Sequence, residues 1–334
     1  MDLEKRPLGQ TGMTITTVGV GAWAIGGPWA FGWGPQDDDA SIAAIHRAIG
    51  HGVNWIDTAA VYGLGHSEEV VGRALRALPA DERPLVFTKG GLVWDASRRD
   101  APPDRVLAPD SIRRECEASL RRLGVERIDL YQFHWPDRSG VPVEESWGAM
   151  LELIDEGKVR AGGVSNFDVG LLERCEAVGH VGSLQPPFSL IERTSGGDVI
   201  PWCAEHETGV VVYSPMQSGL LSGRWSPERS AGLDPGDWRA ADPEFREPRL
   251  RRNLQLADAL RPIAARHGVD VAAVAVAWTI AWPGVTAAIV GARDPGQVDG
   301  WIAAAGLELT PADLDEIAGA VEATGAGNGP VRPG

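Results

Sequence analysis

Cysteine, methionine, tyrosine and lysine are all scarce in this chain of 334 residues. The three cysteines, Cys116, Cys175 and Cys203, are widely spaced, so no CxxC motif, zinc-ligand pattern or disulfide framework can be read from them. We expect reduced thiols, as in a cytoplasmic protein. The chain shows no charged start followed by an apolar stretch and no apolar run of about 18 residues, so we expect no membrane association.

Positive charge is the second deficit. Lysine and arginine together number 31, against 46 aspartate and glutamate residues, which gives a formal net charge of −15. Nucleic acids and anionic membranes attract basic surfaces, so neither is an expected partner. Only Lys5, Lys89 and Lys158 are lysines. Lys89 ends an apolar stretch, where an unpaired ammonium group would be costly.

Strand and helix patterns alternate along the whole chain. The strand-like runs are mostly continuous apolar segments, as expected when both faces of a parallel sheet are buried. Eight such units without a shift in composition favour a single (β/α)8 barrel domain over residues 1–334 rather than an open doubly wound sheet. The expected strands are residues 17–21, 53–57, 85–89, 128–132, 159–164, 183–185, 210–213 and 286–290. The expected helices are residues 39–50, 69–78, 109–123, 142–156, 169–177, 202–207, 250–267 and 271–281.

Further features lie at the two ends of the chain and in two long loops. Residues 3–16 predict a β-hairpin before the barrel, because the glycines there suit a tight turn. Residues 311–321 predict an extra C-terminal helix, and the Gly- and Pro-rich tail from about 325 to 334 is expected to be flexible. The loops 26–35 and 222–248 follow strands, so we expect them as lids on the C-terminal face of the barrel.

A glycine pattern near the start suggests an alternative fold. The segment from Gly19 to Ala24 matches the dinucleotide-binding pattern G-x-G-x-x-G/A. A Rossmann domain, however, needs a helix that starts within the motif, so that its N-terminus meets the pyrophosphate. Here the chain continues into Gly, Pro and Trp, and the next helical pattern starts near residue 38. The Rossmann interpretation is therefore disfavoured.

Four titratable side chains follow three successive expected strands. Asp57 ends the second strand, Tyr62 lies in the loop after it, Lys89 ends the third strand and His134 follows the fourth. Taken singly, Asp57 could cap a turn, Tyr62 could be a packed aromatic and His134 could be a satisfied core histidine. Because the carboxyl ends of barrel strands share one rim, the four together are hard to attribute to packing. Ser67 is expected to cap the helix that follows.

The chemistry of these four groups is compatible. Tyrosine is a weak acid with a pKa of about 10, but a neighbouring ammonium group stabilises its anion and lowers that pKa, and a carboxylate keeps the ammonium charged. A histidine opposite can donate a hydrogen bond to a carbonyl oxygen and orient it. A proton donor with an oxyanion-stabilising group is what carbonyl reduction by a hydride donor requires.

The same constellation resembles the aldo-keto reductase superfamily. The segment from Gly163 to Phe167 strengthens the resemblance, which runs nearly from end to end of the chain. Within the superfamily the chain is most similar to bacterial general-stress reductases that use NADPH, through Trp94 and the segments 132–137, 185–188 and 242–245. The resemblance implies that the tyrosine is the general acid, the lysine and aspartate tune its pKa, the histidine orients the substrate, and no metal ion takes part.

The resemblance also implies where the cofactor, NADPH or NADP+, is bound. Tyr213 would stack on the nicotinamide, and Arg293 would meet the 2′-phosphate and favour NADPH over NADH. Many relatives have Glu-Asn where this chain has Gly300 and Trp301, which leaves the adenine contacts and the strictness of the NADPH preference open. The implied cofactor-binding residues are Ser165, Asn166, Gln185, Tyr213, Ser214, Pro215, Gln217, Gly219, Leu220, Gly291, Arg293 and Gln297.

Tryptophans are frequent near the same predicted rim. They predict an apolar pocket for aromatic or medium-chain aldehydes or ketones, and the substrate-binding candidates are Trp23, Trp29, Trp94 and Trp135. The expected protein is a monomer or weak homo-oligomer with a small carbonyl substrate. Two other functions stay open: a cofactor-sensing regulatory protein with vestigial catalysis, like the channel-associated β subunits of this fold, and a barrel lyase or isomerase without redox chemistry.

Overall fold

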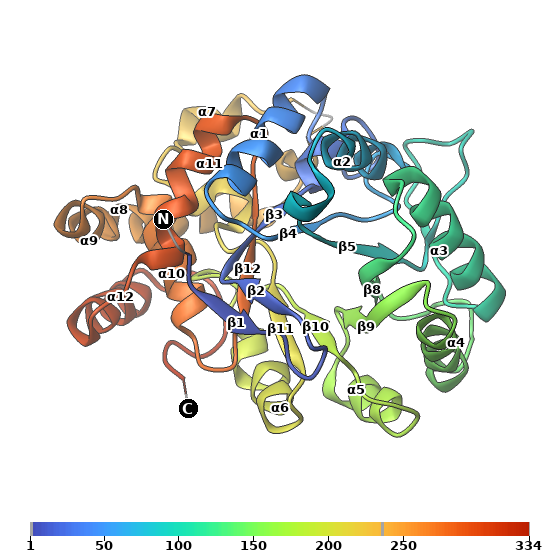
Figure 1. Cartoon of the computed structure of the whole chain (residues 1–334). Helices are drawn as coiled ribbons and strands as arrows, with labels where there is room; N and C mark the ends of the chain where they lie inside the picture. Colours follow the sequence, from blue (N-terminus) through green and yellow to red (C-terminus); the bar gives the residue numbers. More distant parts are fainter. Residues whose placement is uncertain (1–2, 235–236, 334) are drawn as a thin grey trace.

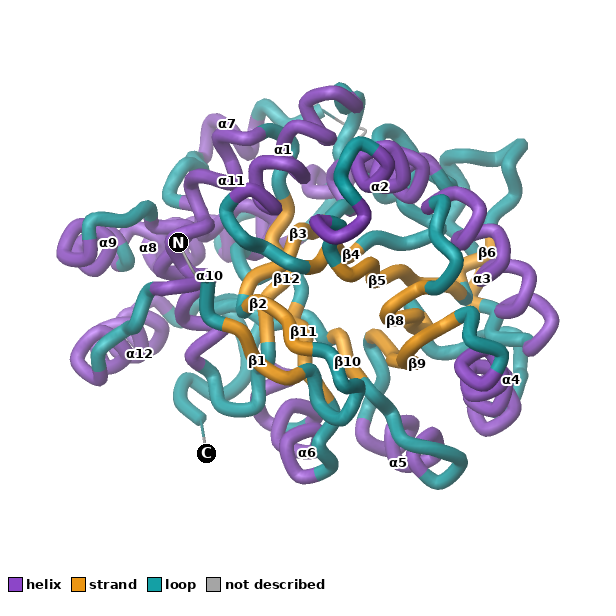
Figure 2. Tube along the Cα trace, in the orientation of Figure 1, coloured by secondary structure: helices purple, strands orange, loops and turns teal. Residues whose placement is uncertain are grey.

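A closed barrel of eight parallel strands forms the centre of the molecule, which confirms the predicted (β/α)8 fold (Figures 1 and 2). Around the barrel the strands follow the order β10-β11-β12-β3-β4-β5-β8-β9. They are β3 (Val18–Gly21), β4 (Trp55–Asp57), β5 (Leu85–Gly90), β8 (Ile128–Phe133), β9 (Val159–Ser165), β10 (Ser183–Gln185), β11 (Gly209–Val212) and β12 (Ala287–Gly291). The computed structural model describes residues 3–234 and 237–333; residues 235–236 of the loop 222–248 and residue 334 of the tail lie outside the described residues.

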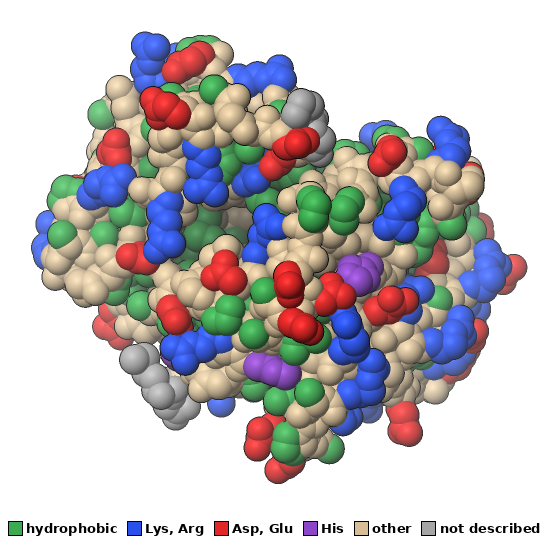
Figure 3. Space-filling view, turned by 90° about the horizontal axis from the view of Figure 1, so that it is seen from above, with side chains coloured by type: hydrophobic (Ala, Val, Ile, Leu, Met, Phe, Trp, Pro, Cys, Tyr) green, Lys and Arg blue, Asp and Glu red, His purple; other side chains and the backbone are tan. Residues whose placement is uncertain are grey.

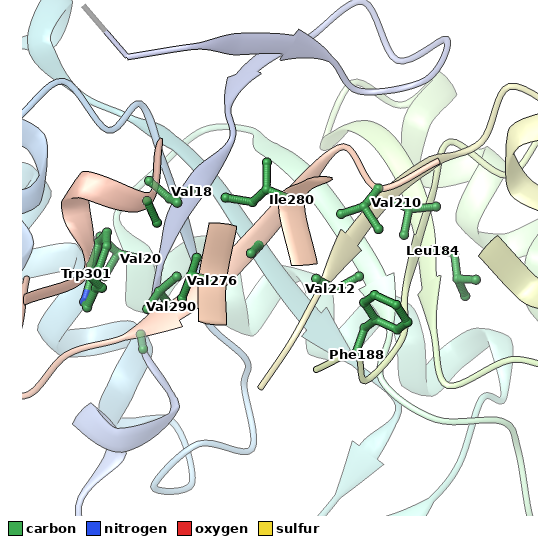
Figure 4. Close-up of a cluster of buried hydrophobic side chains, with 14 of the residues drawn as sticks. Val18, Val20, Leu184, Phe188, Val210, Val212, Val276, Ile280, Val290 and Trp301 are labelled. Atoms are coloured by element: carbon green, nitrogen blue, oxygen red, sulfur yellow. The ribbon is translucent and has the colours of Figure 1, made fainter. Parts of the chain in front are cut away.

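Helices surround the barrel (Figure 2). They are α1 (Asp38–Gly50), α2 (His66–Arg76), α3 (Pro109–Leu123), α4 (Val143–Asp155), α5 (Val169–Glu176), α6 (Val199–Glu205), α7 (Pro227–Ala231), α8 (Arg249–Ala259), α9 (Arg261–His267), α10 (Val271–Ala281), α11 (Pro295–Trp301) and α12 (Pro311–Thr324). A large hydrophobic core joins the helices to the outward faces of the strands. In Figure 4, Val20 and Val290 of adjacent strands lie near Val276 of α10 and Trp301 of α11.

A two-stranded hairpin covers one end of the barrel. Its strands are β1 (Lys5–Pro7) and β2 (Thr14–Thr16), which confirms the N-terminal hairpin, and it lies across the near end of the barrel in Figure 1. Leu8, Met13 and Ile15 of the hairpin pack against Trp55 and Phe87 inside the barrel. Because this end is filled with apolar side chains, the C-terminal ends of the strands are left as the rim on which a site can be built.

The two long loops at that rim contact each other. The first contains the 3-10 turn η1 (Trp23–Gly26), and the second contains α7, η5 (Trp238–Ala240) and η6 (Pro243–Phe245). The rings of Trp23 and Trp238 are stacked with their centroids 5.4 Å apart, and the edge of Trp33 packs against Trp238 at 5.9 Å. The guanidinium of Arg239 lies 4.4 Å from the centre of the Trp33 ring. Aromatic contacts therefore join two segments that are far apart in the sequence.

Some local predictions differ from the structure. The helix predicted over 250–267 is interrupted at Leu260, because Pro262 begins a new helix, α9, where its missing N–H costs nothing. Helix α11 was not predicted, because its seven residues are too few to show a helical period. A short antiparallel pair, β6 (Leu92–Val93) and β7 (Asp104–Arg105), was also missed.

The segment after α12 is held by one buried arginine. The Arg193 guanidinium donates hydrogen bonds to the carbonyl oxygens of Leu190, Ala326 (3.2 Å) and Pro330 (3.2 Å). These bonds fasten the chain beyond α12 to the loop that follows β10. The flexibility of the tail stays a prediction.

Within the described residues, no single helix is long and apolar enough to cross a membrane. One pair bent by 93°, residues 249–267 with 271–281, reaches the necessary length and composition only when its parts are taken together. All but the last residue of α10 are buried in the protein core, which accounts for the apolar composition of the second part. Figure 3 shows acidic and basic side chains interspersed over one face of the molecule.

Candidate active site

Neighbouring strand ends bring Asp57, Lys89 and His134 together, as predicted. Strand β4 ends at Asp57 and pairs with β5, which carries Lys89, and β5 in turn pairs with β8, after which His134 follows directly. Tyr62 lies in the loop after β4. This loop is held to β5 by hydrogen bonds from the Thr58 amide to the Phe87 carbonyl (2.9 Å) and from the Ala60 amide to the Lys89 carbonyl (3.2 Å).

The Lys89 ammonium group is the centre of this arrangement. It donates to Asp57 Oδ2 at 2.5 Å, to the Thr58 carbonyl at 2.9 Å and to the Tyr62 hydroxyl at 3.5 Å. The side chains of Lys89 and Asp57 are buried, so their attraction is little screened by water. With all three ammonium donors directed at oxygen atoms, Lys89 links the carboxylate to the tyrosine hydroxyl.

Burial shifts the pKa values of all three groups. It raises the pKa of Asp57 and lowers that of Lys89, while their mutual ion pair opposes both shifts. Burial also raises the pKa of Tyr62 well above 10, and the Asp57 carboxylate raises it further. We expected the ammonium group to lower this pKa. In the structure burial outweighs that effect, so Tyr62 is a neutral hydroxyl that can donate a proton throughout the physiological pH range.

His134 faces the tyrosine ring and is uncharged. The two ring centroids are 5.5 Å apart at an interplanar angle of 78°. Burial lowers the pKa of His134 well below 6.5, and the positive charges of Lys89 and Arg105 lower it further. Its Nδ1 is buried and has no hydrogen-bond partner among the described residues. A neutral imidazole can both donate and accept a hydrogen bond, so the ring is suited to bind a polar atom beside Tyr62.

Acidification from pH 7.5 to 5 is expected to destabilise the wild-type protein more than the His134→Gln variant. Below the ordinary pKa of about 6.5, an unfolded histidine takes up a proton that the buried ring does not, so the unfolded state binds more protons and stability falls as pH falls. The difference approaches about 1.4 kcal/mol per pH unit below that value. Urea unfolding of both proteins at the two pH values measures it, and equal losses would contradict a buried neutral histidine.

A second buried carboxylate, Glu68, supports strand β5 from the helix side. Glu68 accepts hydrogen bonds from the Thr88 hydroxyl and from Arg122 Nε, each at 2.6 Å. Nothing in the sequence predicts this role, because both partners of Glu68 lie on other elements of the fold. Ser67 was also assigned wrongly: α2 begins at His66, and the Ser67 hydroxyl donates to the Ala22 carbonyl at 2.9 Å instead of capping the helix.

The candidate nicotinamide-binding residues form one hydrogen-bonded group across the rim. The Asn166 amide nitrogen donates to the His134 carbonyl and to Ser165 Oγ, both at 3.0 Å, and its oxygen accepts from the Tyr213 hydroxyl at 2.8 Å. Gln185 Nε2 donates to Asp57 Oδ1 at 2.9 Å. Gln185 and Lys89 therefore bind the two oxygens of the same Asp57 carboxylate. The contact between Gln185 and Asp57 was not predicted from the sequence. The four residues are close together, as expected, but their side-chain amides already have partners within the protein.

The loop after β11 has an unusual backbone. Ser214, Gln217, Ser218 and Gly219 all have positive φ angles, and the amides of Gln217 and Gly219 donate to the carbonyl oxygens of Ser214 (2.8 Å) and Met216 (3.1 Å), so the loop is built of tight turns. Gln217 Oε1 accepts from the Ser189 hydroxyl at 3.0 Å, and this bond fixes one end of the loop. Pro215 and Leu220 are buried beneath it. The resemblance to aldo-keto reductases implies that this loop wraps the pyrophosphate of the cofactor.

Arg293 is not a free cation in the structure. Its Nε donates to Gln36 Oε1 at 2.5 Å, and its Nη2 donates to the Pro35 carbonyl at 2.7 Å. The Gln297 side chain is bound at both ends, since it accepts from the Arg293 amide (3.1 Å) and donates to Asp294 (2.6 Å). Gly291 is exposed at the end of β12. Arg293 thus joins the last strand end to the loop before α1, and Asp294 places a negative charge beside it.

The predicted tryptophans form part of a small apolar cluster around Tyr62. Its buried members are Trp29, Ala59, Val61 and Leu92, and the partly buried side chains packed against them are Trp23, Ala30, Tyr62, Leu64, Trp94 and Trp135. The centroids of Trp23 and Trp29 each lie 6.4 Å from that of Tyr62. All four candidate substrate residues are therefore in the cluster that contains the tyrosine.

The sequence model of the Aldo/keto reductase family matches residues 17–322. The chain belongs to this family. Members of the aldo/keto reductase family are oxidoreductases that use nicotinamide cofactors. A proton donor beside a buried ammonium group, as in Tyr62 and Lys89, is compatible with such chemistry.

Relatives in this family cover almost the whole chain. The aldo-keto reductase YhdN of Bacillus subtilis (strain 168) is 36% identical over 318 residues, which span 94% of this chain and 92% of the relative. The NADH-specific methylglyoxal reductase of Escherichia coli (strain K12) is 34% identical, with 96% and 100% covered. The structure of the glycerol dehydrogenase AKR11B4 from Gluconobacter oxydans superposes with a TM-score of 0.89 at 37% identity, covering 99% of this chain and 98% of that one.

Proposed function

We propose that this aldo/keto reductase reduces aldehydes or ketones to alcohols in the cytoplasm, with NADPH as the hydride donor and Tyr62 as the general acid. The observation that carries the proposal is the buried Lys89 ammonium group, which contacts both Asp57 (2.5 Å) and the Tyr62 hydroxyl (3.5 Å). A buried ion pair costs desolvation energy. A purely structural role for the pair does not account for the contact between the Lys89 ammonium group and the Tyr62 hydroxyl at the C-terminal rim of the barrel.

Each residue has a distinct part in the reaction. NADPH, when bound, supplies a hydride to the carbonyl carbon. Tyr62 gives its proton to the carbonyl oxygen, so that an alcohol is formed and a tyrosinate remains. Lys89 stabilises that anion by charge, and Asp57 keeps Lys89 protonated in spite of its burial. The neutral His134 ring, whose centroid lies 5.5 Å from that of Tyr62, is suited to bind the carbonyl oxygen and orient it toward Tyr62.

The residues present fit a nicotinamide dinucleotide. Tyr213 offers a partly exposed ring beside Asn166, and the resemblance to aldo-keto reductases assigns the positive-φ loop after β11 to the pyrophosphate. The choice of NADPH rests on Arg293, whose guanidinium donates to Gln36 and to the Pro35 carbonyl and makes no salt bridge among the described residues. The tryptophan cluster supports aromatic or medium-chain carbonyl compounds as substrates.

A direct assay tests the proposal and its cofactor preference together. Purified protein is expected to oxidise NADPH in the presence of 4-nitrobenzaldehyde, with a kcat/KM for NADPH at least about tenfold above that for NADH, because the 2′-phosphate adds a charge-assisted hydrogen bond. The Arg293→Ala variant is expected to bring this ratio close to one, mainly through the KM for NADPH. No oxidation of either cofactor across a panel of aldehydes and ketones would refute the reductase assignment. A preference for NADH in the wild type would refute only the role of Arg293.

A further inference from the structure

Arg105 projects toward the candidate substrate site. It lies in β7 directly opposite Leu92 of β6, and residues that face each other in an antiparallel pair carry their side chains on the same side of the sheet. Leu92 packs in the cluster that contains Tyr62 and Trp135. The Arg105 guanidinium lies 4.1 Å from the centre of the Trp135 ring. Arg105 therefore shares the side of the β6–β7 pair that faces the tyrosine.

The guanidinium of Arg105 has no acidic partner. Within residues 3–234 and 237–333 its side chain makes no hydrogen bond and no ion pair, although the residue is only partly exposed. A guanidinium stacked on an aromatic face keeps its N–H donors in the plane of the group, where they can bind two oxygens of one anion. Five unpaired donors beside a candidate substrate pocket are unusual, because buried or half-buried arginines are generally paired.

The acidic groups nearest to Arg105 in the sequence are occupied or lie elsewhere. Asp137 accepts hydrogen bonds from the amides of Leu107 (2.8 Å), Gly140 (2.7 Å) and Val141 (3.0 Å). Asp104 precedes Arg105 in the strand, so its side chain lies on the opposite side of the pair. None of these carboxylates neutralises the guanidinium.

Two other arginines, Arg138 and Arg99, belong to the segments around Arg105. The Arg138 amide donates to the Arg105 carbonyl at 3.0 Å, and the charge of Arg138 acts on the guanidinium of Arg105. Arg99 lies in the connection between β6 and β7. It donates to the carbonyl oxygens of Pro28 and Gly63, both at 3.4 Å, and so lies against the segment that follows Tyr62. The same two segments also carry Asp95, Asp100, Asp104 and Asp137, so it is the unpaired guanidinium of Arg105, and not an excess of positive charge, that suits an anion.

We propose that Arg105 forms an anion subsite at the mouth of the active site, and that the preferred substrates carry a carboxylate or phosphate group remote from the reacting carbonyl. The proposal rests on the reductase function and specifies its substrate class. Arg105 binds the anionic end by paired hydrogen bonds, while Trp135 supports its guanidinium from one face and forms part of the apolar wall along the substrate. The carbonyl end then lies at Tyr62 and His134.

Matched substrates test the subsite. We expect the wild type to reduce 4-carboxybenzaldehyde with a higher kcat/KM than its uncharged methyl ester, and 4-formylphenyl phosphate measures whether phosphate is accepted in the same way. The Arg105→Met variant keeps an apolar side chain on Trp135 but removes the charge. It is expected to lower the ratio of acid to ester kcat/KM by at least about tenfold, mainly through the KM for the acid.

Two further variants separate charge from packing. Arg105→Lys retains the charge without the planar fork, so it is expected to restore part of the preference for the acid. Arg251→Met removes an exposed arginine of α8 whose side chain is 73% accessible and should leave the acid-to-ester ratio unchanged. The proposal is overturned if the wild type reduces the ester as well as the acid, or if Arg105→Met changes both substrates alike.

A binding measurement keeps this proposal separate from the reductase assignment. If neither benzaldehyde is reduced with NADPH or NADH, the reductase function fails, and the subsite is then tested by titrating benzoate into the protein with NADP+ in a calorimeter. Binding that is at least about tenfold weaker in Arg105→Met than in the wild type supports the subsite. Equal binding in the two proteins refutes it.

Discussion

Replacing Tyr62 with phenylalanine is expected to lower the rate of carbonyl reduction by about 10²- to 10⁴-fold, the contribution typical of a general acid. The ring would keep its contacts with Trp23, Trp29 and His134, so the fold and the apolar cluster should persist. Only the hydroxyl that contacts Lys89 is lost. Stopped-flow oxidation of NADPH measures the rate, and fluorescence titration of NADPH should give a dissociation constant close to that of the wild type.

A fully buried tyrosine of the barrel provides the control. Tyr131 is buried in β8, and its hydroxyl has no hydrogen-bond partner among the described residues. Tyr131→Phe is therefore expected to leave the rate unchanged and to preserve or slightly increase stability, because an unsatisfied buried hydroxyl is removed. A Tyr62→Phe variant that reduced aldehydes as fast as Tyr131→Phe would show that Tyr62 is not the acid.

The second large effect is expected for Lys89→Met. The substitution removes the cation that stabilises a tyrosinate, so the rate should fall by two orders of magnitude or more. It also leaves Asp57 as a buried carboxylate without a positively charged partner, although Gln185 still donates to it, and breaking a buried ion pair in this way typically costs about 3–5 kcal/mol. Urea unfolding at pH 7 measures the loss of stability, and the aldehyde assay measures the loss of rate.

A double variant distinguishes the two effects. Combining Lys89→Met with Asp57→Asn removes the uncompensated charge while keeping an oxygen that can accept from Gln185. Most of the lost stability should return, whereas the rate should stay low, because no ammonium group faces Tyr62. If the single and the double variant were equally unstable, an uncompensated carboxylate would not be the cause of the loss. Full activity in the double variant would refute the role of Lys89.

The candidate catalytic residues could be recognised in the sequence because parallel strands bring their carboxyl ends to one rim. Asp57, Lys89 and His134 each end or follow a strand that pairs with the next one, so a correct order of strands was enough to place them together. The strands themselves were visible as apolar runs, since both of their faces are buried. Residues in the long loops were harder to place, because no period in the sequence fixes the path of a loop.

Local signals failed where tertiary contacts outweighed them. Ser67 has the side chain of a good helix cap, but its hydroxyl is used by the Ala22 carbonyl of another segment. Gln185 is one of the residues that the resemblance implies for cofactor binding, and the structure adds its bond to Asp57. Helix α11 is too short for a periodic pattern and is defined by its Asp294 cap and its packing on the barrel.

The sequence by itself determined the class of fold, the order of the strands and the residues that stand at their ends, because these follow from patterns of neighbouring residues. Only the tertiary structure decided how distant loops meet, as in the stacking of Trp23 on Trp238 and the bonds from Arg293 to the loop before α1. It also decided the protonation of the site, since the pKa values of Tyr62 and His134 depend on burial. Burial and contacts between distant segments exist only in the folded chain. The orientation of Arg105 likewise depends on such contacts, namely its pairing with Leu92 and its position over the Trp135 ring.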